Sequence, residues 1–297
     1  MSWIFLALGS HVFWAGENIL TKYSVDKKIK NPYVFLILFT LLEGVIFIIW
    51  PFINFTLPPL PVIGLLVLAG FLYFFGGFPY IKAMQSEEVT RVNILWGLIP
   101  VISLFFGYFF GERISGQESL ALLILVFGTI LASIHLGTGK WRFSRAFWLM
   151  LVACTAFSAY GVVMHQVFKT TPFLNAFILI LFFDFLYSLI VLFFSKKWLK
   201  EFKETVGLID WKFGLVLFLT VFTALGGGIL NQLALSLQQA SLVFALEGFQ
   251  IIFVFVITVL LTVFLPKILQ EKFDKKNLLL KLLALVFMVV GIVILNV

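Results

Sequence analysis

Long apolar stretches separated by short polar connections run through the whole chain. Each stretch holds about 20 residues, and an α-helix of that length is about 30 Å long, which is the thickness of the hydrocarbon core of a bilayer. The pattern therefore predicts ten membrane-spanning helices. Their expected ranges are residues 3–22, 33–53, 61–84, 90–110, 117–136, 146–168, 173–194, 213–235, 241–264 and 278–296.

The connections between the spans are mostly shorter than a dozen residues. Only residues 195–212 and 265–277 are long enough to hold a helix on the membrane surface, so we expect no soluble domain. The first span carries Glu17 and Asn18 inside its apolar stretch and lacks a basic leader and a small-residue cleavage site. We therefore expect it to be retained structure rather than a signal peptide.

The last five spans repeat landmarks of the first five at a constant offset. When residues 70–110 are shifted by 151 positions, seven residues coincide with identical ones. The pairs are Phe71 and Phe222, Gly76 and Gly227, Gly77 and Gly228, Ala83 and Ala234, Val92 and Val243, Leu95 and Leu246, and Gly97 and Gly248. We expect two five-helix units, residues 1–137 and 146–297. Because five is odd, the second unit is inverted in the membrane, and inverted repeats are typical of transporters.

Glycines gather at matching places in the third and eighth spans. Gly76 and Gly77 precede Pro79 in one, and Gly227 and Gly228 lie in a run of three glycines in the other. Such residues weaken a helix, and an interrupted helix inside a membrane lines a cavity. We expect these four glycines to form a hinge or the backbone of a cavity. The alternative is that they allow neighbouring helices to pack closely.

Composition excludes a water-soluble globule, because 62% of the residues are hydrophobic, 12% are charged and the mean hydropathy is +1.12. The odd-numbered connections hold 19 of the 21 Lys and Arg residues, and only Arg113 and Lys169 remain for the others. The positive-inside rule then predicts cytoplasmic odd-numbered connections and two extracytoplasmic termini. Topology and contact with anionic lipids account for the net charge of +7, so we expect no nucleic-acid partner.

Sequence motifs of enzymes and metal sites are missing. The chain has no phosphate-binding loop, no His-Glu-x-x-His motif and no cluster with the spacing of metal ligands. Its one cysteine, Cys154, lies in an apolar span, where a thiol packs as a small hydrophobe, and no internal disulfide is possible. We therefore expect a protein that is not an enzyme and that holds no metal and no cofactor.

A group of motifs in the first half resembles the signature of the EamA family, which belongs to the drug/metabolite transporter superfamily. The motifs are Ile99-Pro100-Val101, Phe109-Phe110-Gly111-Glu112-Arg113, Gln117 and Phe127-Gly128-Thr129-Ile130-Leu131-Ala132. The resemblance extends over essentially the whole chain and implies two inverted five-helix units. In the second half Ile251 replaces the proline and the Gly-Glu-Arg end is missing. Family members usually have cytoplasmic termini, whereas the charge distribution here predicts the opposite.

Four carboxylates lie inside the apolar spans, at Glu17, Glu43, Asp184 and Glu247. A charged group in hydrocarbon costs at least about 2.5 to 3.5 kcal/mol, so each should face a cavity or a partner. Glu43 lies in the middle of the second span, and a gap of one residue aligns it with Asp184 in the seventh. Because deep acids at matched positions suit the carriage of a proton, we expect Glu43 and Asp184 to couple transport to protons. Alternatively, each bonds to a neighbouring helix.

Side chains suited to a ligand lie near Glu17. Trp14 precedes it by about one helical turn and Asn18 follows it, and a carboxylate beside an aromatic ring suits an amine through ion pairing and a cation–π contact. The small multidrug exporters, which are related to the EamA family, also use a glutamate in their first helix. Alternatively, Glu17 forms a structural ion pair with Lys22.

The second half contributes different groups to the expected site. The partner of Glu247 in the repeat is Trp96, so an acid and an aromatic side chain would occupy equivalent positions. Asn231 and Gln232 follow the second glycine cluster and supply uncharged hydrogen-bonding groups. Their alternative role is to bond helices together. We expect all four side chains to contact a substrate.

These observations predict an all-α protein of the cell membrane, a monomer or homodimer, with a cavity between its halves. We expect a gradient-driven, proton-coupled transporter or exporter of a small polar or amphiphilic metabolite, such as an amine or amino acid, that works by alternating access. The first alternative is a flippase for a polyprenyl phosphate head group, which requires Lys82 and Arg91 to line the cavity. The second is a membrane scaffold that transports nothing.

Overall fold

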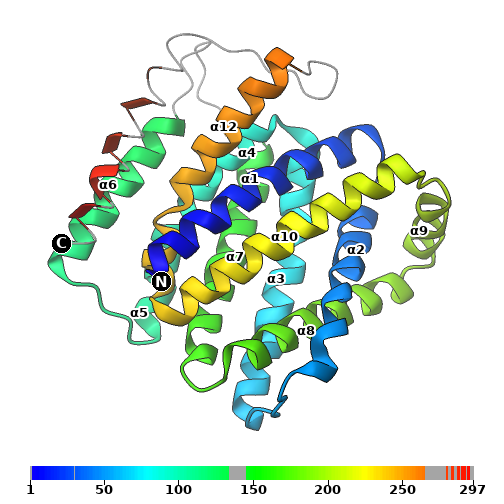
Figure 1. Ribbon diagram of the computed structural model, residues 1–297, viewed down its shortest axis with the longest axis horizontal. Coiled ribbons are helices and arrows are strands. Elements are labelled where there is room, and N and C mark those ends of the chain that lie inside the picture. The colour runs from blue at the N-terminus through cyan, green and yellow to red at the C-terminus, as the bar shows by residue number, and fades with distance from the viewer. Residues whose placement is uncertain are drawn as a thin grey trace.

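The computed structural model describes residues 2–29, 31–133, 145–264 and scattered helical positions between 279 and 294. In this part of the chain the secondary structure is helical throughout, with no strand (Figure 1). The elements are α1 (Trp3–Lys27), α2 (Pro32–Glu43), η1 (Gly44–Phe52), α3 (Leu60–Ser86), α4 (Val89–Leu95), η2 (Trp96–Leu98), α5 (Ile99–Phe109), α6 (Gly116–Ser133), α7 (Arg145–Phe168), α8 (Phe173–Phe194), α9 (Lys196–Gly207), α10 (Trp211–Leu237), α11 (Ala240–Phe244) and α12 (Glu247–Phe264), where η marks a 3₁₀-helix.

Six of the described helical segments are long and apolar enough to cross a membrane. They are Pro32–Phe52, Leu60–Ser86, Arg145–Phe168, Phe173–Phe194, Trp211–Leu237 and Ala240–Phe264. Two more, Trp96–Phe109 and Gly116–Gly128, are apolar but shorter. The total of ten spans stays a prediction, and nine of the nineteen residues of the tenth lie outside the described residues. So does the predicted surface segment 265–277.

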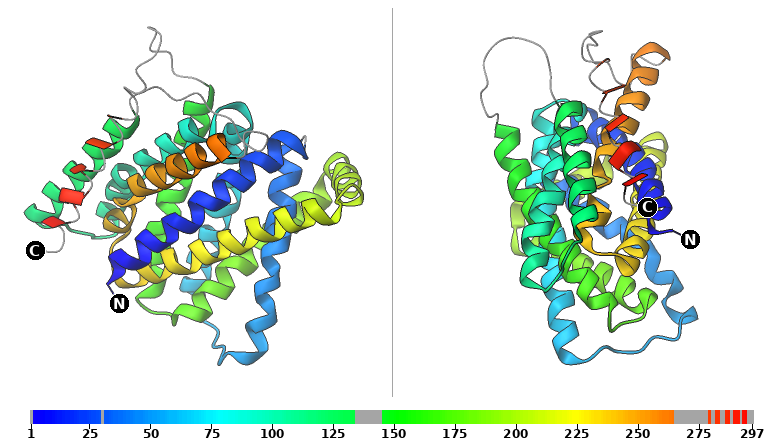
Figure 2. Two further views of the ribbon diagram at one scale, coloured as in Figure 1. Left: turned by 45° about the horizontal axis from the view of Figure 1, so that its top comes forward. Right: turned by 90° about the vertical axis from the view of Figure 1, so that its left-hand side faces the viewer.

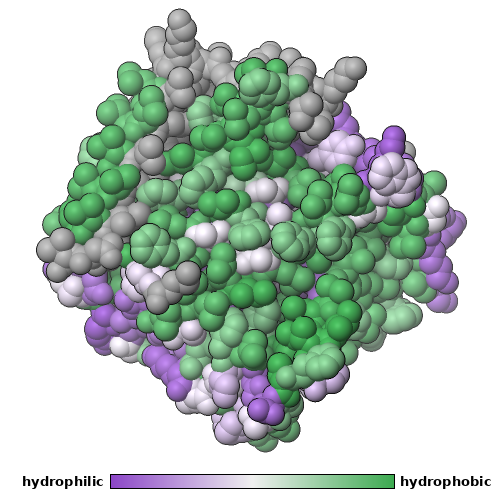
Figure 3. Space-filling view, in the orientation of Figure 1, coloured by the Kyte–Doolittle hydropathy of each residue, from purple (hydrophilic) through white to green (hydrophobic). Residues whose placement is uncertain are grey.

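The outer surface has the apolar character that contact with lipid requires. Apolar residues cover most of the face in Figure 3, and hydrophilic residues gather at its lower left and right edges. Large side chains such as Phe5, Phe105 and Phe218 are more than half exposed. On a soluble protein such a surface would cause association, whereas in a bilayer it contacts acyl chains.

Helix α9 confirms that the connection 195–212 holds a helix outside the spans. Ser195 caps its N-terminus by accepting a hydrogen bond from the backbone N–H of Trp198 at 3.2 Å. The indole of Trp198 packs against the rings of Tyr33 in α2 and Phe78 in α3, at centroid distances of 5.4 and 5.9 Å. Most of its lysines face outward, so α9 is an amphipathic helix fixed to two membrane helices by one aromatic side chain.

Equivalent elements recur at the offset found in the sequence. α3 and α10 have 27 residues each, and both ends of α10 lie 151 residues after those of α3. α4 and α11 begin at the same separation. An internal repeat therefore appears in the elements themselves as well as in the seven identities.

The structure corrects the expected position of the helix interruptions. α3 continues through Gly76, Gly77 and Pro79 without a break, and α10 continues through its three glycines. The α-helix is instead interrupted in the fourth and ninth spans, at the 3₁₀ turn η2 and at Ala245–Leu246, and the second span changes from α-helix to the 3₁₀-helix η1 at Gly44.

Close packing explains why α3 and α10 stay continuous at their glycines. A Cβ on Gly76 would lie 2.9 Å from the Cβ of Ala156 in α7, and one on Gly226 would lie 2.9 Å from the ring of Phe13 in α1. These glycines let α3 approach α7 and let α10 approach α1, as small residues do between membrane helices. Figures 1 and 2 both show α1 and α10 side by side along their length.

Candidate substrate-binding cavity

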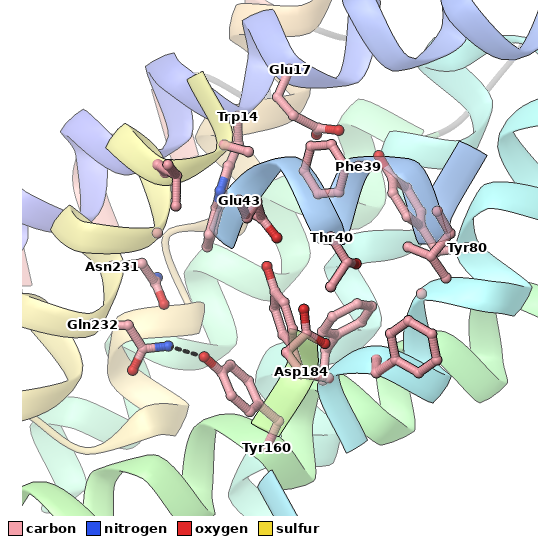
Figure 4. A pocket seen from close by; sticks show the side chains of 18 of the residues that line it. Trp14, Glu17, Phe39, Thr40, Glu43, Tyr80, Tyr160, Asp184, Asn231 and Gln232 are labelled. Atoms are coloured by element: carbon pink, nitrogen blue, oxygen red, sulfur yellow. Dashed lines mark hydrogen bonds between the residues drawn. The ribbon is translucent and has the colours of Figure 1, made fainter. Parts of the chain in front are cut away.

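A cavity of about 150 Å³ lies between the two halves of the chain. Residues from α1, α2, α3, α5, α7, α8, α10 and α12 line it, together with η2 and α11, and Figure 4 shows a part of this lining. Its volume is below the range typical of pockets for drug-sized ligands, which is roughly 300 to 1,000 Å³. In this conformation the cavity has room for a small molecule.

The cavity brings together every side chain that the sequence predicted to bind substrate or to carry a proton. The nine are Trp14, Glu17, Asn18, Glu43, Trp96, Asp184, Asn231, Gln232 and Glu247. The four nominated glycines divide into two pairs. Gly77 and Gly228 line the cavity, whereas Gly76 and Gly227 face neighbouring helices. The binding, coupling and hinge roles of these residues stay predictions.

Glu43 and Asp184 form the centre of the cavity wall. Both are almost fully buried, at 3% and 1% exposure, and both line the cavity together with Glu17. Thr40 of α2 lines the cavity near Asp184 (Figure 4). One carboxylate oxygen of each acid, Oε2 of Glu43 and Oδ1 of Asp184, has no hydrogen-bond partner among the described residues. Two buried acceptors therefore remain for a proton or a ligand.

Two glycines let α2 and α3 approach α8 beside Asp184. A Cβ on Gly44 would lie 3.0 Å from the ring of Phe185 in α8, so the absence of a side chain lets the end of α2 approach that helix. A Cβ on Gly70 in α3 would lie 2.7 Å from the Cβ of Phe183. Because Phe183 and Phe185 flank Asp184, both close approaches lie directly beside this acid.

Glu17 does not pair with Lys22, so the structural alternative for this acid is wrong. Glu17 accepts a hydrogen bond from the hydroxyl of Thr21. The ammonium of Lys22 instead donates to the backbone oxygens of Met84 and Glu87, each at 2.7 Å, and lies 3.1 Å from a carboxylate oxygen of Asp26. The Lys22 side chain therefore binds the C-terminal end of α3 and leaves Glu17 to the cavity.

Glu247 begins α12 directly after the interruption in the ninth span. Its carboxylate is 3% exposed and lines the cavity. Oε2 of Glu247 also lies 3.7 Å from Nδ1 of His11. His11 lies in the first span, and its contact with the ninth span depends on tertiary packing.

Tyrosines on the inner faces of α3 and α7 were missed from the sequence. Tyr80 donates to Oδ1 of Asn18, and Gln232 donates to the hydroxyl of Tyr160, the bond that is dashed in Figure 4. Tyr73 also lines the cavity. Their signal in the sequence was weak, because a tyrosine in an apolar span is equally typical of the interface between membrane and water.

The charges of the lining residues are of one sign. Four carboxylates line the cavity, and no Lys or Arg is among the lining residues that the structure describes. Lys82 lies elsewhere, with its ammonium 5.8 Å from the centre of the Tyr33 ring. Nor do the described residues hold a group of three or more His, Cys, Asp or Glu that could bind a metal ion.

The fold and this cavity define a multi-pass membrane protein of the transporter type. Residues 1–134 match the EamA-like transporter family, which belongs to the drug/metabolite transporter superfamily, and this match confirms the resemblance predicted from the motifs of the first half. No curated protein matches the chain significantly.

Twenty-eight chains of solved structures are significantly similar in fold. One crystal structure covers 98% of this chain and 94% of its own chain, with a TM-score of 0.67 and 14% sequence identity. At this identity the similarity establishes the fold alone. It extends the fold assignment across the second half, which the family match does not reach.

Proposed function

We propose that the protein is a gradient-driven, proton-coupled transporter of a small amphiphilic molecule that carries a protonated amine. The observation that supports this most strongly is that the ionisable side chains of the cavity are acidic. Four carboxylates and several aromatic rings line it, and no Lys or Arg is among the described lining residues. A carboxylate in a site shielded from water must either take up a proton or pair with a cation. An amine supplies a cation, and indole and phenol rings bind cations through their faces.

The same cavity favours an amine over an amino acid. The carboxylate of an amino acid would have no Lys or Arg to pair with among the described lining residues, and it would enter a site that holds four other carboxylates. It also disfavours a polyprenyl phosphate head group for the same reason, since Lys82 is not a lining residue, while the side chain of Arg91 lies outside the described part of the structure. The open acceptor atoms on Glu43 and Asp184 argue against a scaffold without a ligand.

Helix packing supports alternating access by two inverted halves. If the first, third and fourth spans are equivalent to the sixth, eighth and ninth, the close pair α1–α10 becomes α7–α3, and the pair α1–α12 becomes α7–α5. All four pairs are among the most extensive helix contacts of the described residues. The two halves therefore make equivalent contacts with each other. Transporters with this symmetry work by rocking one helix group against the other around a central site. The inversion itself remains part of the proposal, as does a cytoplasmic location of the odd-numbered connections.

Transport assays in proteoliposomes can test the substrate class with three matched probes. 2-Phenylethylamine has an aromatic ring and an amine, phenylalanine adds a carboxylate, and 2-phenylethanol replaces the amine by a hydroxyl. We expect counterflow and stabilisation of the purified protein against heat with 2-phenylethylamine, a weaker response to phenylalanine and none to 2-phenylethanol. A stronger response to phenylalanine, or an equal response to all three probes, contradicts the proposal.

Variants of the acid pair test the proton coupling. Glu43→Gln and Asp184→Asn each remove a carriable proton and keep the shape of the side chain. We expect both to retain counterflow and to lose amine uptake driven by a pH gradient. Glu204→Gln is the matched control, because Glu204 lies on α9 with 61% of its side chain exposed. Gradient-driven uptake with unchanged pH dependence in Glu43→Gln would show that Glu43 does not carry the coupling.

A further inference from the structure

A chain of hydrogen bonds with a fixed direction joins α4, α12 and α1. Nδ2 of Asn93 donates to the backbone oxygen of Val89 at 2.9 Å. A carbonyl oxygen can only accept, so this bond fixes the orientation of the Asn93 amide and leaves its Oδ1 as an acceptor. Nε2 of Gln250 donates to that Oδ1 at 3.0 Å, which in turn directs Oε1 of Gln250 toward Nδ1 of His11 at 3.2 Å.

The direction of this chain determines the tautomer of His11. Since Oε1 of Gln250 accepts, Nδ1 of His11 carries the proton and donates it. In the neutral ring Nε2 then has a bare lone pair. The side chain of His11 is fully buried, and Nε2 has no hydrogen-bond partner among the described residues. A buried base is thus held in one orientation, with its basic nitrogen free to take a proton.

Glu247 is the acid that shares this environment. Its Oε2 lies 3.7 Å from Nδ1 of His11, and its carboxylate also lines the cavity. The other described partners of His11 are neutral, namely Gln250 of α12 and the ring of Trp14 on its own helix, at 5.8 Å between centroids. Glu247 therefore faces a base on one side and the candidate ligand on the other.

We propose that His11 and Glu247 form a second proton site, which holds one exchangeable proton and releases it when an amine binds. The proton resides on Nε2 of His11 with Glu247 ionised, or on Glu247 with the imidazole neutral. The ammonium group of a ligand needs the ionised carboxylate as its counter-ion, so the proton leaves to water as the ligand enters. One positive charge replaces another. This exchange rests on the proposed amine transport, whereas the tautomer of His11 does not.

Nuclear magnetic resonance of protein labelled with ¹⁵N-histidine tests the tautomer directly, with no transport required. We expect neutral His11 to carry its proton on Nδ1. His165 is the internal standard, because its Nδ1 bonds to the backbone oxygen of Leu235 at 2.7 Å and must also be the donor. His11→Gln and His165→Gln assign the two signals. Gln250→Leu removes the acceptor, and we expect it to give His11 a mixture of tautomers without moving the His165 signal. A proton on Nε2 of neutral His11 in the unaltered protein overturns the proposal.

Binding of 2-phenylethylamine, measured by calorimetry in buffers of different ionisation enthalpy, tests the exchange. We expect Glu247→Gln to release about one proton fewer per amine than the unaltered protein. His11→Phe removes the base and the donor but keeps an aromatic ring, so the carboxylate holds its proton more strongly and the pH midpoint of amine binding moves upward. An unchanged midpoint, with the His165 signal intact, overturns the role of His11. If no probe amine binds at all, the proposed function fails while the tautomer result still stands.

Discussion

Trp96 and Glu247 are equivalent residues of the repeat, and each begins a helical element at the interruption of its span beside the cavity. Trp96 opens the 3₁₀ turn that divides the fourth span, and Glu247 opens α12 after the break in the ninth. Both side chains line the cavity and are more than nine-tenths buried. The repeat thus provides two equivalent breaks, and the difference between an indole and a carboxylate gives the two walls different chemistry.

Replacement of Gly227 tests whether the second glycine cluster serves helix packing. A Cβ there would lie 2.5 Å from Cδ1 of Trp14 and 3.1 Å from the backbone oxygen of Ser10, so Gly227→Ala must displace α1 or the indole. We expect it to destabilise the protein by about 1 to 3 kcal/mol, the usual cost of overpacking. The midpoint of thermal unfolding in detergent measures this. Gly228→Ala is the control, because nothing lies within 4 Å of its Cβ. Equal effects of the two variants would contradict the packing role.

The ammonium of Lys22 should stabilise the fold without serving the substrate. Lys22→Met removes the donor of two backbone oxygens at the end of α3 and leaves Asp26 without this partner. We expect a loss of about 1 to 3 kcal/mol in the free energy of unfolding, because buried acceptors lose their bonds. Amine uptake per folded molecule should stay the same, since Glu17 is bonded to Thr21. Lys27→Met, at an exposed position of the same helix, is the matched control. If the folded Lys22→Met variant lost amine binding, the result would support the alternative in which Lys22 pairs with Glu17.

Glu112 should make the stability of the protein depend on pH. It follows α5, folds back over Gly107 and is 5% exposed, and burial raises the pKa of its carboxyl, while the charge of Lys169 partly opposes the shift. A raised pKa in the folded state means that the folded protein binds this proton more tightly than the unfolded chain. The stabilisation is therefore present below the ordinary glutamate pKa of about 4.3 and is lost as the pH rises through the folded value.

The corresponding variant, Glu112→Gln, keeps the shape of the side chain and cannot ionise. We expect its unfolding midpoint to fall less steeply with rising pH than that of the unaltered protein, so that the variant is the more stable of the two at neutral pH. Glu204→Gln on the exposed face of α9 controls for the change in net charge. Parallel pH profiles for the unaltered protein and Glu112→Gln would refute the assignment.

The indole N–H of Trp96 should recognise an acceptor group on the ligand. It has no partner among the described residues, whereas the ring packs on Tyr80 and Phe157 at 5.1 and 5.4 Å. Trp96→Phe keeps the packing and deletes the donor. We expect 2-amino-1-phenylethanol to bind about 2- to 10-fold more tightly than 2-phenylethylamine, and Trp96→Phe to abolish the difference. Titration calorimetry measures both affinities, and a preference that persists in the variant would assign the contact to another donor.

The ends of the long helices could be predicted well from hydropathy. The seventh span was expected at 173–194 and is α8, Phe173–Phe194, while the third and eighth were each two residues or fewer from the observed ends. Lipid imposes this regularity, because every backbone group inside the bilayer must bond within its own helix. The interruptions could not be located in this way, since glycine weakens a helix only where packing does not hold it together.

The acidic residues of the candidate site could be predicted from the sequence, whereas their neutral partners could not. Buried acids in apolar spans are costly, so Glu17, Glu43, Asp184 and Glu247 stood out one by one. Neutral polar side chains cost less to bury and are therefore less conspicuous in an apolar span. Nothing in the local sequence distinguished the hydrogen-bonded series Asn93, Gln250 and His11 from polar side chains that only hold helices together. Residues separated by 239 positions meet in that chain.

By itself the sequence determined the membrane class, the internal repeat and the inventory of buried charges, because each follows from the cost of exposing polar groups to hydrocarbon or apolar groups to water. Tertiary structure alone decided which groups meet. It gave Lys22 to the end of α3 rather than to Glu17, placed Gly76 and Gly227 against other helices, and set His11 beside Glu247. These outcomes depend on distances of a few ångströms between helices, which side-chain shape determines and hydropathy does not encode.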